Sequence, residues 1–264
     1  MMRIIVQIVS ALILCMLSLT APVLAEDEDL APRDQLSIFA AASLADVLPD
    51  LIHAWDSSHK QDASPKMIFG PSATLARQIT LGAPADIFLS ANPHWSSEIA
   101  KSLKTTQAPV MIAGNSLVLV GNKSIYTTAT GSADLETLIG TIANAPRLAI
   151  ANPATAPAGE YAHKFLHRTG QWDALQGKLA LGNSVRQALL YAERSNMLAI
   201  VYATDAVASN HVHILGNIPK DMSGVITYSA TNVTNRMSGQ DFIAFLKSSA
   251  AGKIWASHGF TLPE

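Results

Sequence analysis

Hydrophobic residues alternate between two spacings along most of the chain. Short apolar runs at 36–43 (LSIFAAAS) and 85–92 (ADIFLSAN) predict strands. The nearly continuous apolar runs at 115–122 (NSLVLVGN) and 146–153 (PRLAIANP) are typical of strands buried on both faces. Between such runs, apolar residues recur at the i, i+3, i+4, i+7 spacing of a helix, first over 44–55. This alternation predicts an α/β fold with a parallel or mixed sheet and right-handed crossovers.

The same two spacings predict the remaining elements. Ser43 and Ser72 each stand directly before a helical pattern, so both are expected as N-caps. Pro49 is expected to kink the first helix, because it follows the first turn. Further strands are expected at 65–70, 197–204 and 211–217, and further helices at 72–82, 93–103, 158–170, 183–196 and 241–259.

The first 25 residues have the pattern of a secretory signal peptide. Arg3 precedes an uncharged apolar run, and the small residues Val23 and Ala25 fit a peptidase site, which predicts cleavage after Ala25. The polar segment 26–33 that follows is expected to be a disordered leader. The uncharged run could nearly span a bilayer, so a retained membrane anchor is the alternative. Either way the protein is expected to be exported.

Charge and cysteine content remove several classes of function. The chain has 18 Lys and Arg against 20 Asp and Glu; removing the signal takes away one basic residue and no acidic one, which leaves a net charge of −3. This balance predicts no basic surface for nucleic acid. The one cysteine, Cys15, lies in the signal, so the mature chain forms no disulfide and no thiolate site.

Several predicted helices open with small or polar residues directly after a strand or turn. These corners are at Ser43, Ser72, 157–159 (PAG) and 184–185 (SV). The N-terminus of a helix presents unpaired N–H donors and a partial positive charge, and together they favour an anion. Each serine alone is equally interpretable as a helix cap worth about 1 kcal/mol. Spacing does not decide whether the four corners converge.

Motifs for other chemistry are absent or weak. The chain contains no G-x-G-x-x-G, G-x-x-x-x-G-K-[ST] or G-x-S-x-G, so dinucleotide, nucleoside triphosphate and serine-hydrolase functions lack their usual support. His163 and His167 lie one helical turn apart, and His211 and His213 share one face of a strand. No carboxylate stands in the zincin position, so we interpret them as surface histidines and predict no cation site.

Six segments together resemble a known family. They are 38–51 (IFAAASLADVLPDL), 69–92 (FGPSATLARQITLGAPADIFLSAN), 115–120 (NSLVLV), 147–166 (RLAIANPATAPAGEYAHKFL), 185–209 (VRQALLYAERSNMLAIVYATDAVAS) and 245–262 (FLKSSAAGKIWASHGFTL). In this order and spacing they are similar to the molybdate-binding proteins of ATP-driven importers, which are periplasmic binding proteins. The similarity covers about 36–262, nearly the whole mature chain.

The resemblance implies a two-lobed (Venus-flytrap) α/β fold. Each lobe is expected to hold a mixed, mostly parallel sheet flanked by helices. After the signal peptide (1–25) and the leader (26–33), the first lobe is expected over 34–113 and the second over 114–209. The segment 210–264 is expected to return to the first lobe.

The resemblance also implies which residues bind the oxyanion. Ser43 and Ser72 would contribute hydroxyls, Ala158 and Val185 would contribute backbone N–H groups, and Tyr202 would contribute its hydroxyl. The sequence departs from the family's pattern in two places. At 183–186, NSVR replaces an acidic corner, which should matter little because the donor there is main chain. At 70–73 (GPSA), Pro71 has no N–H and Ala73 has no hydroxyl. Affinity and the rejection of sulfate are expected to depend on these two positions.

The predicted function is high-affinity periplasmic binding of molybdate and tungstate and delivery to the membrane permease of an importer. The protein is expected to be a monomer that catalyses nothing and needs no cofactor. A donor-only pocket disfavours hydrogen phosphate, whose proton needs an acceptor. Three alternatives stay open: a carrier of sulfate, phosphate or phosphonate, a secreted hydrolase, and a sensory protein that has lost its ligand. Tyr202 and Asp205 are close in sequence, but neither forms a nucleophile with a paired base.

Overall fold

Strands pair into two separate five-stranded sheets in the computed structural model, which describes residues 35–59, 63–127 and 133–263. The first sheet has the order β2 (Lys66–Gly70), β1 (Ser37–Ala41), β3 (Ile87–Ser90), β10 (Ile226–Asn232), β4 (Val110–Asn115). The second has the order β7 (Leu179–Gly182), β6 (Leu148–Ala151), β8 (Leu198–Tyr202), β5 (Leu117–Asn122), β9 (Val212–Ile218). The predicted signal peptide and leader lie outside the described residues.

Both sheets mix parallel and antiparallel pairs in the same way. In the first, β1 runs parallel to β2 and β3, while β10 runs antiparallel to β3 and β4. In the second, β6 runs parallel to β7 and β8, while β5 runs antiparallel to β8 and β9. The two-sheet α/β class is confirmed. The expectation of mixed, mostly parallel sheets is confirmed as well, because only β10 in the first sheet and only β5 in the second run against the other strands.

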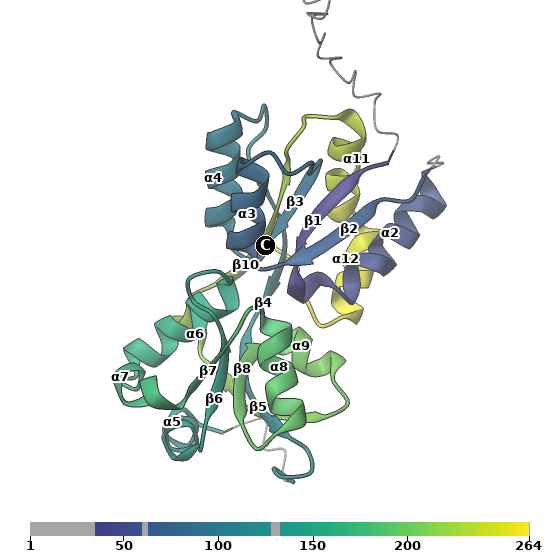
Figure 1. Cartoon of the computed structure of the whole chain (residues 1–264). Helices are drawn as coiled ribbons and strands as arrows, with labels where there is room; N and C mark the ends of the chain where they lie inside the picture. Colours follow the sequence, from purple (N-terminus) through teal and green to yellow (C-terminus); the bar gives the residue numbers. More distant parts are fainter. Residues whose placement is uncertain (1–34, 60–62, 128–132, 264) are drawn as a thin grey trace, which may run out of the picture. The chain divides into compact units, whose positions relative to one another are not determined.

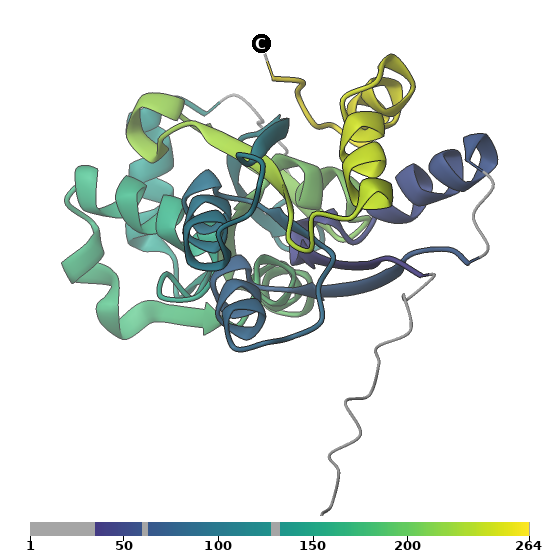
Figure 2. The ribbon, with the colours of Figure 1, turned by 90° about the horizontal axis from the view of Figure 1, so that it is seen from above.

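Helices cover both faces of the first sheet (Figure 1). On one side α3 (Ser72–Thr80) and α4 (Pro93–Leu103) lie against β1, β3 and β10. On the other side lie α2 (Val47–Ser58), α11 (Met237–Leu246) and α12 (Ser249–Ser257), and Figure 2 shows α11 and α12 beside α2. Phe39 and Phe88 are buried under α3 and α4, while Trp55 and Trp255 are buried on the α2 side.

The second sheet is also covered on both faces (Figure 1). One face carries α6 (Pro157–Arg168), with α5 (Leu135–Asn144) and α7 (Trp172–Leu175) near it, and the other carries α8 (Val185–Arg194) and α9 (Ala203–Ala208). The short elements are η1 (Ala42–Leu44), η2 (Gln176–Lys178) and α10 (Lys220–Ser223). None of the helices in the described part of the chain is long and apolar enough to cross a bilayer.

The chain crosses between the sheets twice, once from β4 to β5 and once from β9 to β10. Both crossings fall later than the domain boundaries predicted at 113/114 and 209/210. β4 stays in the first sheet through Asn115, and β9 pairs with β5 in the second sheet through Ile218. Strand pairing therefore corrects the second boundary, because 212–218 adds an edge strand to the second sheet instead of returning to the first.

Local helix signals account for two further corrections. The helix expected over 44–55 begins only at Val47, after a 3-10 turn at η1, so Pro49 lies in the first turn and requires no kink. The single helix expected over 241–259 is two helices, because Ser248 caps α12 by accepting the N–H of Ala251 at 3.2 Å. β4, β7, β10 and α5 were not anticipated.

Candidate functional site

A small cavity lies where elements of the two sheets meet. Its volume is about 20 Å³, just above the roughly 10–15 Å³ that one water molecule requires. All five residues expected to bind the oxyanion line it. The lining consists of Ala41, Ala42, Ser43, Gly70, Pro71, Ser72, Ala91, Ala156, Pro157, Ala158, Ser184, Val185 and Tyr202.

The topology explains why residues so far apart in sequence meet here. Ser43 and Ser72 follow the carboxyl ends of β1 and β2, which are parallel neighbours. Ala158 and Val185 follow the carboxyl ends of β6 and β7, and Tyr202 is the last residue of β8. The carboxyl ends of parallel strands open at one edge of a sheet, which is the usual ligand position in α/β folds. Each sheet contributes one such edge to the cavity.

Ser43 does not cap a helix. It lies in η1 with 3% of its surface exposed, and its Oγ is 2.7 Å from the hydroxyl oxygen of Tyr228 on β10. The helix that follows starts at Val47, too far along the chain for the Ser43 side chain to reach its first N–H groups. The N-cap prediction is wrong at this position, and the hydroxyl is held by a distant strand.

Ser72 is the first residue of α3, and Pro71 occupies the N-cap position. The Ser72 hydroxyl accepts the backbone N–H of Ala91 at 3.2 Å instead of an N–H of its own helix. The N-cap prediction is therefore wrong at Ser72 too. The backbone N–H of Ala73 donates across to the carbonyl of Thr155 at 3.1 Å, beside the second sheet. Ala73 does not line the cavity, whereas Pro71 does.

The N-termini of two helices of the second sheet also line the cavity. Ala158 is the second residue of α6, and Val185 is the first residue of α8. N–H groups in a first helical turn have no intrahelical acceptor and carry the positive end of the helix dipole. Ser184 caps α8 by accepting the N–H of Gln187 at 3.3 Å, as its spacing predicts.

Two glycines hold these helix starts in place: Gly159 in the predicted corner 157–159, and Gly182, which sequence reasoning did not single out. A Cβ at Gly159 would overlap the carbonyl oxygen of Ala151 on β6. A Cβ at Gly182 would lie 2.9 Å from the backbone nitrogen of Ala188 in α8. Only glycine therefore allows α6 and α8 to start directly against the strand ends. A glycine just before a helix-opening corner is the signal that could have found Gly182.

Tyr202 lines the cavity and carries a hydroxyl without a partner among the described residues. The side chain is 1% exposed. Burial raises the pKa of Tyr202 well above its usual value, reinforced by the nearby Tyr228. The phenol is therefore a neutral donor. A buried polar group without a partner is costly, and a bound acceptor would remove that cost.

An ion-pair cluster lies beside the cavity and joins elements of both sheets. Arg186 on α8 places its Nε 2.7 Å from Oδ1 of Asp205 and its Nη2 2.6 Å from Oδ2 of Asp46, which precedes α2. Burial raises the pKa of Asp205 to about 7, although the Arg186 guanidinium opposes the shift. Sequence reasoning missed Arg186, which has no motif and is recognisable only from its position after Val185.

A second set of contacts joins the sheets on another side of the cavity. Glu160, in the first turn of α6, accepts from Nδ2 of Asn92 at 2.8 Å and from Nε1 of Trp95 at 3.1 Å. Asn92 caps α4 and Trp95 lies in its first turn, so both donors belong to the first sheet's helices. With the bond from Ala73 to Thr155, these contacts hold the two groups of elements together around the cavity.

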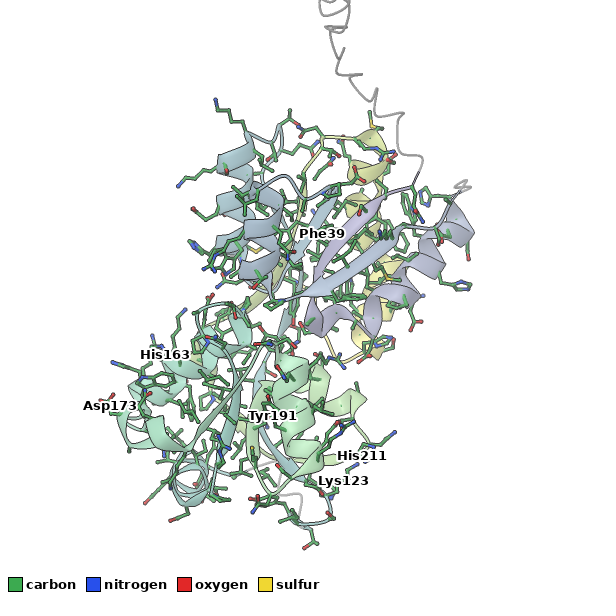
Figure 3. All side chains as sticks on the ribbon, in the orientation of Figure 1. Phe39, Lys123, His163, Asp173, Tyr191 and His211 are labelled. Atoms are coloured by element: carbon green, nitrogen blue, oxygen red, sulfur yellow. The ribbon has the colours of Figure 1, made fainter. Side chains whose placement is uncertain are left out.

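The histidine pairs lie elsewhere. The rings of His163 and His167 are 6.0 Å apart on α6, and His163 packs edge-on against Trp172 at 4.2 Å. Figure 3 shows His163 near α7 and His211 on the opposite side of the second sheet's elements. In the described part of the chain, no three His, Cys, Asp or Glu side chains come close enough to hold a metal ion.

Fold and cavity together define a two-lobed solute-binding protein, and comparisons with known proteins agree. Residues 36–261 match the family model "Bacterial extracellular solute-binding protein". The molybdate-binding protein ModA of Escherichia coli is 37% identical over 238 residues, covering 88% of this chain and 91% of that protein. The chain therefore belongs to the bacterial extracellular solute-binding proteins, which confirms the predicted resemblance.

Two solved structures share the fold. The periplasmic molybdate-binding protein of Azotobacter vinelandii superposes with a TM-score of 0.73 at 21% identity, covering 87% of this chain and 100% of that one. The sulfate-binding protein SubI from Mycobacterium tuberculosis gives the same TM-score, 0.73, at 15% identity, covering 87% of each chain. The fold alone therefore does not distinguish the two anions.

Proposed function

We propose that this protein binds molybdate or tungstate outside the cytoplasm and delivers it to an ATP-driven importer. The observation that carries the proposal is the convergence of Ser43, Ser72, Ala158, Val185 and Tyr202 on one small buried cavity. The name and 37% identity of the Escherichia coli relative support this choice of anion.

The donors suit a fully ionised tetrahedral dianion. Three hydroxyls and two sets of helix-terminal amides offer hydrogen bonds without a formal positive charge on the lining. Hydrogen bonds to a charged acceptor are shorter and stronger than neutral ones, and the buried setting strengthens them. Hydrogen phosphate would bring a proton that requires an acceptor, and leaving a polar group unpaired costs about 1–3 kcal/mol.

The division of donors between the two sheets suits a transport function. Ser43 and Ser72 follow strands of the first sheet, while Ala158, Val185 and Tyr202 belong to the second. An anion is fully coordinated only when the two halves come together, and the closed form is what a membrane permease would recognise. In this proposal the protein is a periplasmic monomer, exported by its N-terminal signal, that carries its ligand unchanged and uses no cofactor.

A sulfate carrier is the second candidate. The sulfate-binding SubI structure shares the fold, and the fold does not distinguish the two anions. Sulfate has the same charge and shape as molybdate but is smaller, so the size of the closed cavity separates the two.

The test is thermal unfolding of residues 26–264 with molybdate, tungstate, sulfate or phosphate added in turn. A ligand at one hundred times its dissociation constant stabilises the native state by about 2.7 kcal/mol, which raises the midpoint by several degrees. A larger shift with molybdate and tungstate than with sulfate or phosphate supports the proposal. A shift with sulfate or phosphate alone would make that anion the ligand in place of molybdate. The absence of a shift with any of the four anions would reject the proposed function.

Tyr202→Phe is the matched variant for this test. It removes the one cavity hydroxyl that has no partner among the described residues, so the ligand-free protein should keep or gain stability. The ligand-induced shift should shrink. A ligand-induced shift that stays at the wild-type value would remove Tyr202 from the site.

A further inference from the structure

A buried chain of polar side chains runs from the crossing between the sheets to the cavity. Nδ2 of Asn115 lies 2.9 Å from Oγ1 of Thr204 and 3.3 Å from the hydroxyl oxygen of Tyr228, which is 2.7 Å from Oγ of Ser43. Asn115, Thr204, Tyr228 and Ser43 are each at most 6% exposed. Protein groups, rather than bulk water, therefore set the direction of each bond.

The direction of the chain follows from one obligatory donor. The backbone N–H of Ser116 donates to Oδ1 of Asn115 at 2.9 Å, which fixes the orientation of the amide. Nδ2 then faces Tyr228 and Thr204 as a donor. The Tyr228 oxygen accepts from Asn115, and its own proton has Ser43 as its acceptor among the described residues. Burial also keeps Tyr228 protonated by raising its pKa far above the usual value.

Ser43 is thereby biased toward donation into the cavity, because Tyr228 occupies one of the two lone pairs of its oxygen. Its oxygen accepts from Tyr228, so its own proton is free to point at a ligand. Ser72 is in the same state, because its oxygen accepts the N–H of Ala91. Tyr202 has a free hydroxyl that burial keeps protonated. These three hydroxyls of the lining are therefore prepared as donors, and the fourth, that of Ser184, accepts the N–H of Gln187.

We propose that Tyr228 and Asn115 are positioning residues for anion specificity. They hold the Ser43 hydroxyl as a donor, and so make the cavity reject oxyanions that carry a proton. This inference rests on the proposed function, because it concerns the same cavity. Neither residue lines the cavity, so both act through Ser43.

Sulfate and hydrogen phosphate provide the probe. Both are tetrahedral dianions of nearly equal size, and they differ by one proton. Effects of ligand charge and of pocket size therefore cancel in the ratio of their dissociation constants, and the effect of the proton remains. Dissociation constants for molybdate, sulfate and phosphate are measured by calorimetry on wild type and Tyr228→Phe at neutral pH. In Tyr228→Phe the Ser43 oxygen is free to accept a proton. The preference for sulfate over phosphate should therefore fall about tenfold.

Two further variants separate positioning from a general structural role. Tyr161→Phe removes another buried tyrosine hydroxyl, one bonded to the Thr227 backbone instead of Ser43, and should keep the wild-type ratio. In a Ser43→Ala background, Tyr228→Phe should no longer change the ratio, because the group it positions is absent.

Each outcome decides one of the two proposals. An unchanged ratio in Tyr228→Phe, or an equal change in the Ser43→Ala background, overturns the inference and leaves the proposed function standing. A wild type that binds sulfate and not molybdate overturns the proposed cargo, and the ratio still tests Tyr228. A wild type that binds none of the three anions overturns both.

Discussion

The two walls of the cavity offer the same kind of bond by different means. One wall, formed by Ser43 and Ser72 of the first sheet, presents side-chain hydroxyls. The other, formed by Ala158 and Val185 at two helix starts of the second sheet, presents backbone amides. We call them the hydroxyl wall and the amide wall.

The comparison shows where each wall can fail. A hydroxyl rotates and can either donate or accept, so the hydroxyl wall depends on Tyr228 and on the Ala91 N–H to fix its direction. A helix-terminal N–H has a fixed direction and no alternative role. The amide wall depends instead on backbone position, which Gly159 and Gly182 secure.

The largest loss of affinity is expected on the hydroxyl wall. Ser43→Ala and Ser72→Ala should each weaken anion binding by roughly 1.5–3 kcal/mol, the range for hydrogen bonds to charged groups. Each also leaves a buried donor of the protein without its acceptor, so the free energy of unfolding should fall as well. Calorimetric titration and thermal unfolding measure the two effects. Wild-type affinity in both variants would contradict the site assignment.

The amide wall should resist side-chain changes and respond to loss of an N–H. Val185→Pro removes the N–H at the first position of α8, where proline is well accommodated because Ser184 before it is extended. Affinity should fall by about 1.5 kcal/mol, while stability changes little. Val185→Ala is the control, because it keeps the N–H and should bind nearly as wild type. Equal affinities for the two variants would remove this amide from the site.

A smaller effect is expected where the walls are held together away from the ligand. Both carboxylate oxygens of Glu160 accept hydrogen bonds, one from Asn92 and one from Trp95. In Glu160→Gln the side-chain NH2 group replaces one of these oxygens, so one of the two donors loses its acceptor. These groups are partly exposed, so the lost contact should weaken anion binding by about 0.5–1 kcal/mol. Titration of this variant beside Glu136→Gln, a change in the first turn of α5, measures the difference. Identical affinities would show that the contact does not contribute to closure.

The smallest effect is expected at Ala73. The sequence suggests that its missing hydroxyl weakens the site, but Ala73 does not line the cavity and its N–H already bonds to Thr155. Ala73→Ser should therefore leave anion affinity within about twofold of wild type, a difference well below 1 kcal/mol. A gain of tenfold in a titration would restore the role that the sequence suggested.

Much of the fold and the site could be predicted from the sequence, for a physical reason. Strand and helix periodicity reflects local burial, so the α/β class and most elements of the first 100 described residues were correct. The helix-cap roles of Ser43 and Ser72 were wrong, because N-cap preference describes a serine near a helix start and not which acceptor or donor reaches it. For Ser43 that partner is Tyr228, 185 residues away.

The same reason explains the errors at the boundaries. The apolar pattern of β9 predicts a strand but does not predict which sheet the strand joins. Its pairing with β5 places it in the second sheet. Arg186 and Asp205 carry no motif in the sequence, and their pairing depends on how α8 and α9 pack.

Trp95 gives the protein an optical property of its own. Its indole N–H bonds to Glu160 across the two sheets, whereas Trp55 and Trp255 are at most 1% exposed within the first sheet's core and Trp172 lies on α7 near His163. Separation of the sheets would expose the Trp95 ring to water while the core tryptophans stay covered. Intrinsic fluorescence could then follow opening and closing in real time without any attached dye.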